Sequence, residues 1–181
     1  AEHFTYIEPF VGGGAMLFHM LQKYTNIGRV IINDINPNLI TAYRVIRDTP
    51  ERLITDLKML QREFRQNSNE EARKEYFLRI RKSYNEDTHN DVTNTAMFIF
   101  LNRTCFNGLY RVNSKGYFNV PFGKYTNPTI CDEELLLEDS KILQNVEILC
   151  GDYTLIERYV DNNTFIYFDP PYRPLSTTSS F

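Results

Sequence analysis

Cysteine and histidine are scarce in this sequence of 181 residues, which contains three of each. Cys105, Cys131 and Cys150 are an odd number, lie far apart and form no Cys-x-x-Cys pair. A disulfide framework or a zinc site is therefore not expected, and we expect a reducing cytoplasm. The histidines are equally scattered, and their neighbours indicate no metal or proton-relay role.

Long apolar runs are also missing. No stretch approaches the length of a membrane-spanning helix, and the first residues lack the charged-then-apolar layout of a signal peptide. The sequence has 42% hydrophobic and 24% charged residues and no Pro/Gly/Ser-rich stretch, which is typical of a globular domain. The length allows one sizeable core.

Acidic residues are absent from one long segment. Residues 92–131 contain no Asp or Glu but four Lys or Arg side chains. Within a net charge of -3, this segment carries +4 and the rest of the chain -7. Because phosphate backbones select local basic patches, the charge distribution allows a nucleic-acid partner despite the negative total.

The order of the apolar patterns indicates an α/β fold. Short apolar or β-branched runs predict buried strands at residues 4–7, 29–34, 146–150 and 164–168. Helical patterns occupy residues 15–24, 38–83, 93–102 and 132–143. Between them, residues 112–118 predict a hairpin that turns at Ser-Lys-Gly. We therefore predict a sheet with a polar and aromatic insertion before its fourth strand.

Three predicted strands end in residues suited to ligand binding. Ligands of open α/β sheets bind at the carboxyl ends of strands. The first strand is followed by three glycines at residues 12–14, and Asp34 stands twenty positions past Gly14, the usual spacing of a ribose-binding carboxylate. Asp152 is a candidate to bind an adenine amino group. The alternatives are a tight turn for the glycines, a helix cap for Asp34 and a loop turn for Asp152.

The fourth strand is followed by a more specific motif. Residues 169–172 are Asp-Pro-Pro-Tyr. Proline averages about 5% of residues, so an acid or amide followed by Pro-Pro and an aromatic arises by chance in under roughly 1% of chains this long. The alternative is a rigid turn with an exposed tyrosine.

This motif suits the chemistry of a weakly nucleophilic amine. The lone pair of an exocyclic nucleobase amine is delocalised into the ring. Hydrogen bonds to the Asp169 carboxylate and the Pro170 carbonyl would pull the nitrogen toward tetrahedral geometry and aim its lone pair at an activated methyl group. Pro170 and Pro171 fix the backbone, and Tyr172 can stack on a base that has left the duplex. Catalysis would come mainly from positioning, with no metal needed.

In three motifs the sequence resembles the Dam-type (DpnII-like) DNA adenine N6-methyltransferases. The motifs are residues 6–14, residues 106–113 with 118–123, and residues 169–172, in the family's order. The resemblance implies a Rossmann-like methyltransferase sheet that binds S-adenosylmethionine (SAM), with an inserted helical and hairpin DNA-recognition region. It also implies methyl transfer from SAM to adenine N6 in double-stranded DNA, with GATC as the target.

The same resemblance implies roles for individual residues. Its catalytic motif corresponds to Asp169, Pro170, Pro171 and Tyr172. The SAM-binding residues would be Glu8, Pro9, Phe10, Gly12, Gly13, Gly14, Asp34, Asp152, Tyr153 and Asp169. The DNA-binding residues would be Arg103, Phe106, Asn107, Leu109, Arg111, Asn113, Lys115 and Pro121. Among these, Arg111 would read a guanine edge with its planar fork, and Phe106 would insert beside the flipped adenine. Arg103 and Lys115 would hold phosphates.

Two features of the family pattern are missing. A Lys-Trp-x-Gly-Gly-Lys segment usually precedes the SAM motif, and several strands usually follow the catalytic motif, but this sequence contains neither. We therefore expect a fold that is incomplete at both ends. Residues 1–50 and 145–181 would form a partial SAM-binding catalytic domain, and residues 51–144 an inserted target-recognition region. We expect a monomer that binds DNA and neither a membrane nor a metal.

Two other functions are compatible with parts of the pattern. Related motifs serve enzymes that methylate a side-chain amide of a protein, although these usually carry Asn in place of Asp169, and they have no use for an acid-free basic hairpin. A DNA-binding module that holds SAM without methylating is the other alternative. The intact Asp-Pro-Pro-Tyr motif argues against it, and DNA binding that is independent of SAM would favour it.

Overall fold

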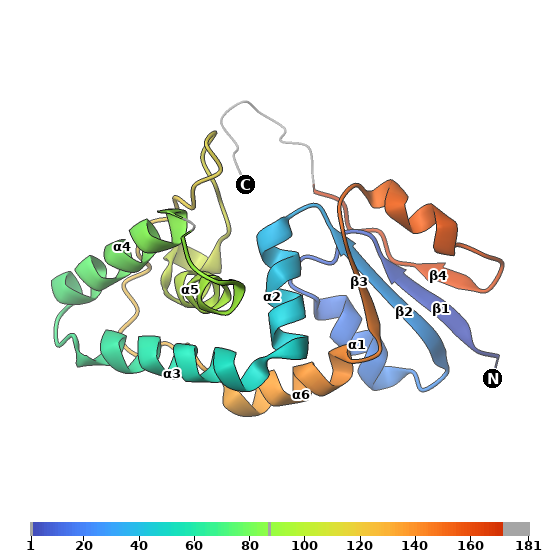
Figure 1. The fold of residues 1–181 in the computed structure, drawn as a ribbon, viewed down its shortest axis with the longest axis horizontal. Helices are drawn as coiled ribbons and strands as arrows, with labels where there is room; N and C mark the ends of the chain where they lie inside the picture. The colour runs from blue at the N-terminus through green and yellow to red at the C-terminus, as the bar shows by residue number, and fades with distance from the viewer. Residues whose placement is uncertain (1, 87, 172–181) are drawn as a thin grey trace. The chain divides into compact units, whose positions relative to one another are not determined.

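The computed structural model describes residues 2–86 and 88–171 of the chain, which divides into two compact units (Figure 1). The first consists of Ala1–Arg47 and Asp139–Phe181, and we call it the sheet unit. The second, Asp48–Glu138, is called the helical unit. No helix in the described part of the chain combines the length and apolar character that a bilayer crossing needs.

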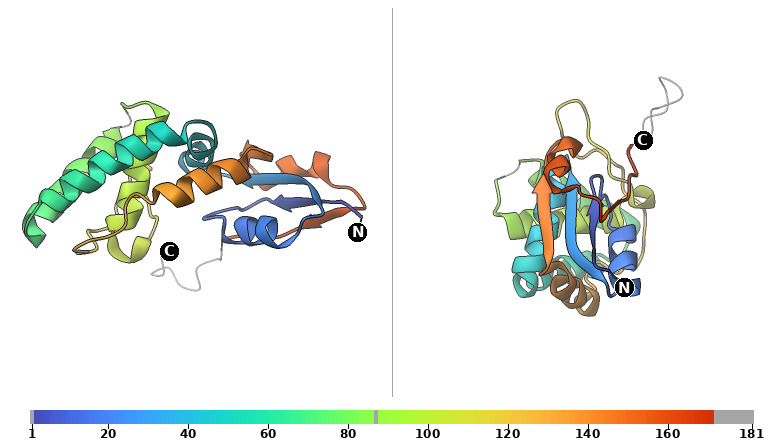
Figure 2. Two further views of the ribbon diagram at one scale, coloured as in Figure 1. Left: turned by 90° about the horizontal axis from the view of Figure 1, so that it is seen from below. Right: turned by 90° about the vertical axis from the view of Figure 1, so that its right-hand side faces the viewer.

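The sheet unit is built on four parallel strands that lie side by side (Figures 1 and 2). They are β1 (Phe4–Glu8), β2 (Ile27–Asp34), β3 (Val146–Cys150) and β4 (Thr164–Ile166), in the spatial order β3-β2-β1-β4. Parallel neighbours require crossover connections. The helix α1 (Ala15–Lys23) connects β1 to β2, and the 3-10 helix η2 (Tyr153–Tyr159) connects β3 to β4. The order reverses between β1 and β4, so the switch point of the sheet lies there.

Alternating side chains along the strands supply the core of the sheet unit. On one face, Tyr6 and Ile32 are fully buried, packed in one cluster with Leu17 of α1 and with Ile40 of α2 (Pro37–Asp48). The next residues in each strand point to the opposite face, as the strand period of two requires. There, Ile7 and Ile31 pack with Ile156 of η2. The four predicted strands are therefore confirmed, although β4 ends two residues earlier than expected and, contrary to the prediction, none of its residues is buried.

The helical unit is formed around three long helices. They are α3 (Pro50–Gln66), α4 (Glu70–Glu86) and α5 (Asp91–Thr104). α6 (Glu133–Leu143) follows later in the chain. Pro50 begins α3, where its missing N–H costs no hydrogen bond. Phe64 and Phe100 are fully buried, with ring centroids 5.7 Å apart in an edge-to-face arrangement.

The predicted helical stretch at residues 38–83 is in fact three helices, α2, α3 and α4. Pro50 marks the first break, and Asn67 and Asn69 flank the second. The Nδ2 of Asn67 donates to the carbonyl of Glu63, and the Oδ1 of Asn69 accepts from the N–H of Ala72. These asparagine side chains satisfy groups at a helix end and a helix start. Between Phe64 and Tyr76 the only apolar residue of the sequence is Ala72, so the hydrophobic periodicity lapses across this second break.

The segment after α5 folds as a loop with two antiparallel bridges, which we call the recognition loop (residues 104–123). Single backbone β-bridges pair Cys105 with Phe122 and Val112 with Phe118. Gly116 has a φ of +80°, the left-handed conformation that the predicted Ser-Lys-Gly turn needs. The predicted hairpin is therefore confirmed, with a single bridge in place of longer strands. The inserted region as a whole lies between β2 and β3, so it precedes the third strand of the chain and not, as predicted from the sequence, the fourth.

Candidate functional site

The sheet unit carries its candidate site beyond the carboxyl ends of β1 and β4. The backbone N–H of Tyr167 donates to the carbonyl of Ile7 at 2.9 Å, so the chain after β4 follows β1 to the switch point. Asp169 then lies close enough to Glu8 for its charge to raise the pKa of the Glu8 carboxyl. The motif after β4 and the glycine segment after β1 are therefore parts of one site.

Two cavities border this site. The first, of about 460 Å³, brings together most residues predicted to bind SAM. Its lining residues are Pro9, Phe10, Gly12, Asp34, Ile35, Gly151, Asp152, Tyr153, Asp169 and Pro171. The second has a volume of about 660 Å³. Its lining residues are Glu8, Phe10, Val11, Gly12, Gly13, Gly14, Ala15, Met16, His19, Tyr167 and Asp169. Phe10, Gly12 and Asp169 line both cavities.

Asp34 holds the glycine segment in place. Its Oδ2 accepts a hydrogen bond from the N–H of Gly12 at 3.1 Å, and its Oδ1 accepts from the N–H of Asn36 at 2.9 Å. The cap of α2 is Asn36, whose Oδ1 accepts from the N–H groups of Asn38 and Leu39. The helix-cap alternative for Asp34 is therefore wrong. Each carboxylate oxygen can accept more than one hydrogen bond, so Asp34 retains acceptor capacity toward the cavity.

Two residues that support the glycine segment were not predicted from the sequence. Asn33 is fully buried, and its Nδ2 donates to the carbonyls of Pro9 and Gly151 at 3.1 and 3.0 Å. It thereby ties together the loops that follow β1 and β3. Tyr43 of α2 donates its hydroxyl to the carbonyl of Gly12 at 2.9 Å. All three bonds join residues far apart in sequence, which no local pattern signals.

An aromatic cluster lies beside the first cavity, which two of its members, Phe10 and Tyr153, line. The rings of Phe10 and Tyr153 have centroids 5.6 Å apart, and those of Phe10 and Phe168 are 6.2 Å apart. Tyr153 and Phe168 are each about half exposed, at 48% and 53%. Exposed ring faces beside carboxylates suit a ligand with a flat apolar part and polar edges.

Asp152 has a structural role in its loop, which was the alternative to ligand binding in the sequence analysis. Its Oδ1 accepts from the N–H and the hydroxyl of Thr154, at 3.0 and 2.7 Å, and caps η2. These hydrogen bonds, first the backbone one, lower the pKa of Asp152. The side chain is exposed and lines the first cavity. Capping and ligand binding are compatible here because a carboxylate has a second oxygen.

Glu8 is a buried carboxyl group at the carboxyl end of β1. It is only 2% exposed, and the hydroxyl of Tyr6 donates to its Oε1 at 2.6 Å. Burial, followed by the nearby charge of Asp169, raises the pKa of Glu8 from 4.5 to about 6, although the hydrogen bond from Tyr6 opposes the shift. A buried acid that titrates near neutral pH is a common feature of functional sites.

Glu8→Gln is expected to make folding stability less dependent on pH. A folded-state pKa above the unfolded value means that the charged form destabilises the fold at high pH, and that this cost disappears as pH falls through about 6 toward 4.5. At about pH 8 the variant should be more stable than the wild type by about 2 kcal/mol. The gap should close near pH 4.5, as measured by denaturant unfolding. A gap that stays constant with pH would contradict the assignment to Glu8.

The helical unit carries the residues predicted to bind DNA. Phe106 and Leu109 are 51% and 49% exposed in the recognition loop. The other exposed members of the predicted set are Arg103, Asn107, Asn113, Lys115 and Pro121. Arg111 is half-buried, and its Nε donates to Oδ1 of Asn119. The structure thus places the whole set in one short segment of this unit.

Some of these polar groups already have partners within the unit. The Oδ1 of Asn113 accepts from the N–H groups of Lys115 and Tyr117 and closes the turn. Lys124, one of the four cations in the acid-free segment, pairs with Glu70 at 3.1 Å. The basic character predicted from residues 92–131 is therefore partly neutralised by an acid from outside that segment.

The exposed Asp169, Pro170 and Pro171 are described by the structure, whereas Tyr172 lies outside the described residues. The D12 class N6 adenine-specific DNA methyltransferase model matches residues 1–181 of the sequence. The chain belongs to this family. The order of the sequence motifs and the match over residues 1–181 thus indicate the same family.

Relatives of this D12-class chain include type II methyltransferases and DNA adenine methylases. It is 53% identical over 178 residues to the type II methyltransferase M.MjaIII of Methanocaldococcus jannaschii, covering 97% of this chain and 61% of the relative. It is 43% identical over 181 residues to the type II methyltransferase M1.LlaDCHI of Lactococcus lactis subsp. cremoris, covering 97% and 59%. Identity to a DNA adenine methylase of Vibrio cholerae is 38% over 175 residues, covering 97% and 58%. The chain therefore spans about three fifths of the length of these relatives.

Proposed function

We propose that the protein transfers a methyl group from SAM to N6 of adenine in double-stranded DNA. The proposal rests on one observation: Asp169 and Gly12 of the glycine segment line the same two cavities at the switch point of the sheet. Membership of the D12 family and the names of the relatives support the reaction type. We further propose a partial catalytic domain at residues 1–50 and 145–181, with an inserted target-recognition region at 51–144.

The residues of the sheet unit fit a bound SAM molecule. The cavity of about 460 Å³ is bordered by the rings of Phe10 and Tyr153 and by the carboxylates of Asp34 and Asp152. An added Cβ would meet no atom within 4 Å at Gly12, which leaves room for close approach.

SAM supplies an electrophilic methyl group on a positively charged sulfur. Glu8, with its carboxylate at the second cavity, would hold positively charged parts of the cofactor. The Asp169 carboxylate and the Pro170 carbonyl would accept hydrogen bonds from the adenine amine and turn its lone pair toward the methyl carbon. When bound, SAM would supply the methyl group and leave as the neutral thioether, and Asp169 would accept the amine proton and pass it to solvent. Positioning of the two reactants supplies most of the rate.

The recognition loop would supply sequence preference. We propose GATC as the target, on the strength of the motif resemblance and of the adenine methylases among the relatives. Arg111 would read a guanine edge, whereas Lys115 would contact a phosphate. Arg103 would also hold a phosphate, and Phe106 and Leu109 offer apolar surface to the bases. Relatives named type II methyltransferases support a role beside a restriction endonuclease.

Arg111→Ala and Lys115→Ala should have different effects on DNA methylation. Arg111→Ala should relax preference at one base pair, with a loss of discrimination of about 10-fold or more there. Lys115→Ala should weaken binding to all duplexes equally and reduce the dependence of affinity on salt. Initial rates on GATC duplexes and on duplexes with single base-pair changes provide the measurement. The assignment of Arg111 fails if its removal changes the rate on every duplex by the same factor.

A direct test of the function is methylation of DNA with labelled SAM. The protein carrying this chain, at its full length, is incubated with unmethylated duplexes, and the nucleosides are then analysed. Formation of N6-methyladenine supports the proposal. Transfer of label to protein and not to DNA would favour the side-chain amide methyltransferase alternative.

A further inference from the structure

Arg111 is held by its neighbour across the recognition loop. Its Nε donates to Oδ1 of Asn119 at 2.8 Å, and its Nη2 donates to the carbonyl of the same residue at 3.2 Å. These bonds use one side of the guanidinium fork and two of its five N–H groups. The two N–H groups at the tip of the side chain, one on each terminal nitrogen, take no part in these two hydrogen bonds. That pair is sufficient for a two-bonded contact with a base edge.

Asn119 is itself fixed by its position in the chain. Phe118 and Val120 on either side are buried, at 2% and 1% exposure, while Asn119 is half-buried. The N–H of Asn119 also donates to the carbonyl of Arg111 at 3.1 Å. Movement of the Asn119 main chain away from Arg111 would therefore require removal of Phe118 and Val120 from the core.

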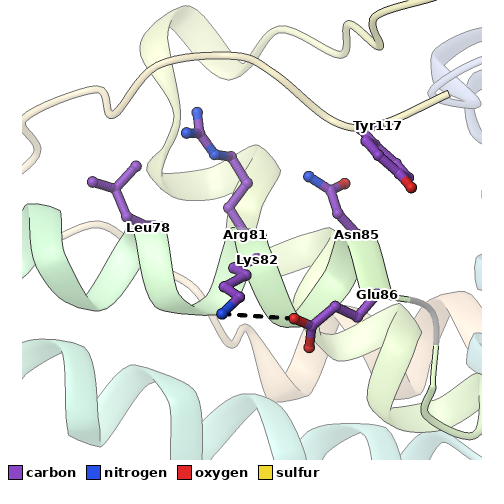
Figure 3. Close-up of a pocket in the computed structure, with 6 residues that line it drawn as sticks. All are labelled: Leu78, Arg81, Lys82, Asn85, Glu86 and Tyr117. Atoms are coloured by element: carbon purple, nitrogen blue, oxygen red, sulfur yellow. Dashed lines mark ion pairs between the residues drawn. The ribbon is translucent and has the colours of Figure 1, made fainter. Parts of the chain in front are cut away.

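Helix α4 fastens this segment from the other side. The Asn85 side chain forms a paired contact with Phe118, because its Oδ1 accepts from the Phe118 N–H at 2.8 Å and its Nδ2 donates to the Phe118 carbonyl at 3.1 Å. Arg81, one turn earlier, donates from Nη1 to the carbonyl of Val120 at 3.2 Å. Figure 3 shows Arg81 and Asn85 projecting from α4 on the side where Tyr117 lies. The amide of Asn85 thus replaces the backbone of a neighbouring strand.

These contacts form a continuous series from α4 to the guanidinium group. Asn85 and Arg81 satisfy the main chain on both sides of Asn119, and Asn119 in turn orients Arg111. Arginine side chains have many rotamers, and ordering one on binding lowers affinity. An arginine that is already ordered discriminates better, because it cannot swing to an alternative acceptor on a wrong base pair.

We infer that Asn119 is a specificity-determining positioning residue, which sets the orientation in which Arg111 reads the DNA. The inference rests on the proposed function of Arg111. It predicts that Asn119 acts on sequence preference through Arg111 and has no separate influence on the cofactor.

The test compares substitutions at residue 119 in the protein at its full length. For each variant, kcat/KM is measured on the preferred duplex and on duplexes with one base-pair change at each position of the target. Asn119→Ala removes the Oδ1 acceptor, and Asn119→Asp retains it. Asn127→Ala, an exposed asparagine in the same unit, is the matched control.

Asn119→Ala should lower discrimination by about 10-fold at the position where Arg111→Ala lowers it, with an unchanged KM for SAM. Asn119→Asp should keep most of the discrimination, and Asn127→Ala all of it. The double variant Arg111→Ala/Asn119→Ala should be no less selective than Arg111→Ala alone, because the two residues act as one unit.

An equal loss on all duplexes for Asn119→Ala would overturn the inference and make Asn119 a phosphate contact or a purely structural residue. Additive effects in the double variant would also overturn it. If Arg111→Ala itself left base preference unchanged, the proposed role of Arg111 would fail first. The two failures are therefore distinguishable.

Discussion

Asp169→Ala is expected to lower the rate of methyl transfer by about 10³-fold or more, a loss typical of removing a group that stabilises a transition state. In the proposed mechanism the carboxylate would accept a hydrogen bond from the amine and give it nucleophilic character. Asp169 is exposed and lines both cavities, so its removal should not disturb the core. Single-turnover methylation of a target duplex measures the effect.

SAM affinity provides the control for this variant. It should remain largely intact in Asp169→Ala, because Phe10, Tyr153 and Asp34 border the first cavity, the proposed SAM site, independently of residue 169. Asp169→Asn keeps the shape and one acceptor oxygen and should retain more activity than the alanine variant. Near-normal turnover by Asp169→Ala would eliminate the proposed mechanism, whereas joint loss of turnover and SAM binding would reduce Asp169 to a cofactor ligand.

Gly14→Ala and Gly13→Ala should have sharply different effects on stability. Gly14 has a φ of +76°, and a Cβ there would meet the hydroxyl of Tyr43. The left-handed conformation costs an alanine about 1–2 kcal/mol, and displacing Tyr43 would break its hydrogen bond to the Gly12 carbonyl. We expect Gly14→Ala to lower the free energy of unfolding by about 2–4 kcal/mol, at the upper end for single substitutions.

Gly13→Ala is the matched control in the same turn. No atom lies within 4 Å of its added Cβ, so stability should change by less than about 0.5 kcal/mol. Gly13 lines the second cavity, and weaker SAM binding without loss of stability would place the cofactor against it. Thermal unfolding and SAM titration of both variants make the comparison. Equal destabilisation by the two would show that Tyr43 does not constrain the turn.

The elements of the sheet unit were largely predictable, because each parallel strand contains a short apolar or β-branched run. Residues 146–150 coincide with β3, and residues 29–34 lie within β2. The strand predicted at residues 164–168 ends early, since Phe168 leaves the sheet to contact Phe10 near the site. The 3-10 helix η2 was missed because its apolar pattern is too short to distinguish from a loop.

The parts of the site that depend on long-range side-chain contacts were not predictable. The motif after β4 and the glycine segment after β1 could be placed at one sheet edge, because the carboxyl ends of parallel strands meet there. Asn33, Tyr43 and Asn119 could not be assigned from sequence. Each acts through partners that are close only in the folded chain, as in the bond from Asn33 to Gly151. An isolated Asn or Tyr carries no pattern that distinguishes such a role.

The most direct test of the account is the nucleoside product formed by the protein at its full length, and by this chain alone, with labelled SAM and unmethylated duplexes. Duplexes with and without GATC are compared, and the digested DNA is analysed for methylated bases. The account predicts N6-methyladenine, formed on GATC duplexes in preference to the others. Absence of methylated DNA from the full-length protein, with SAM bound, would contradict the proposed methyl transfer.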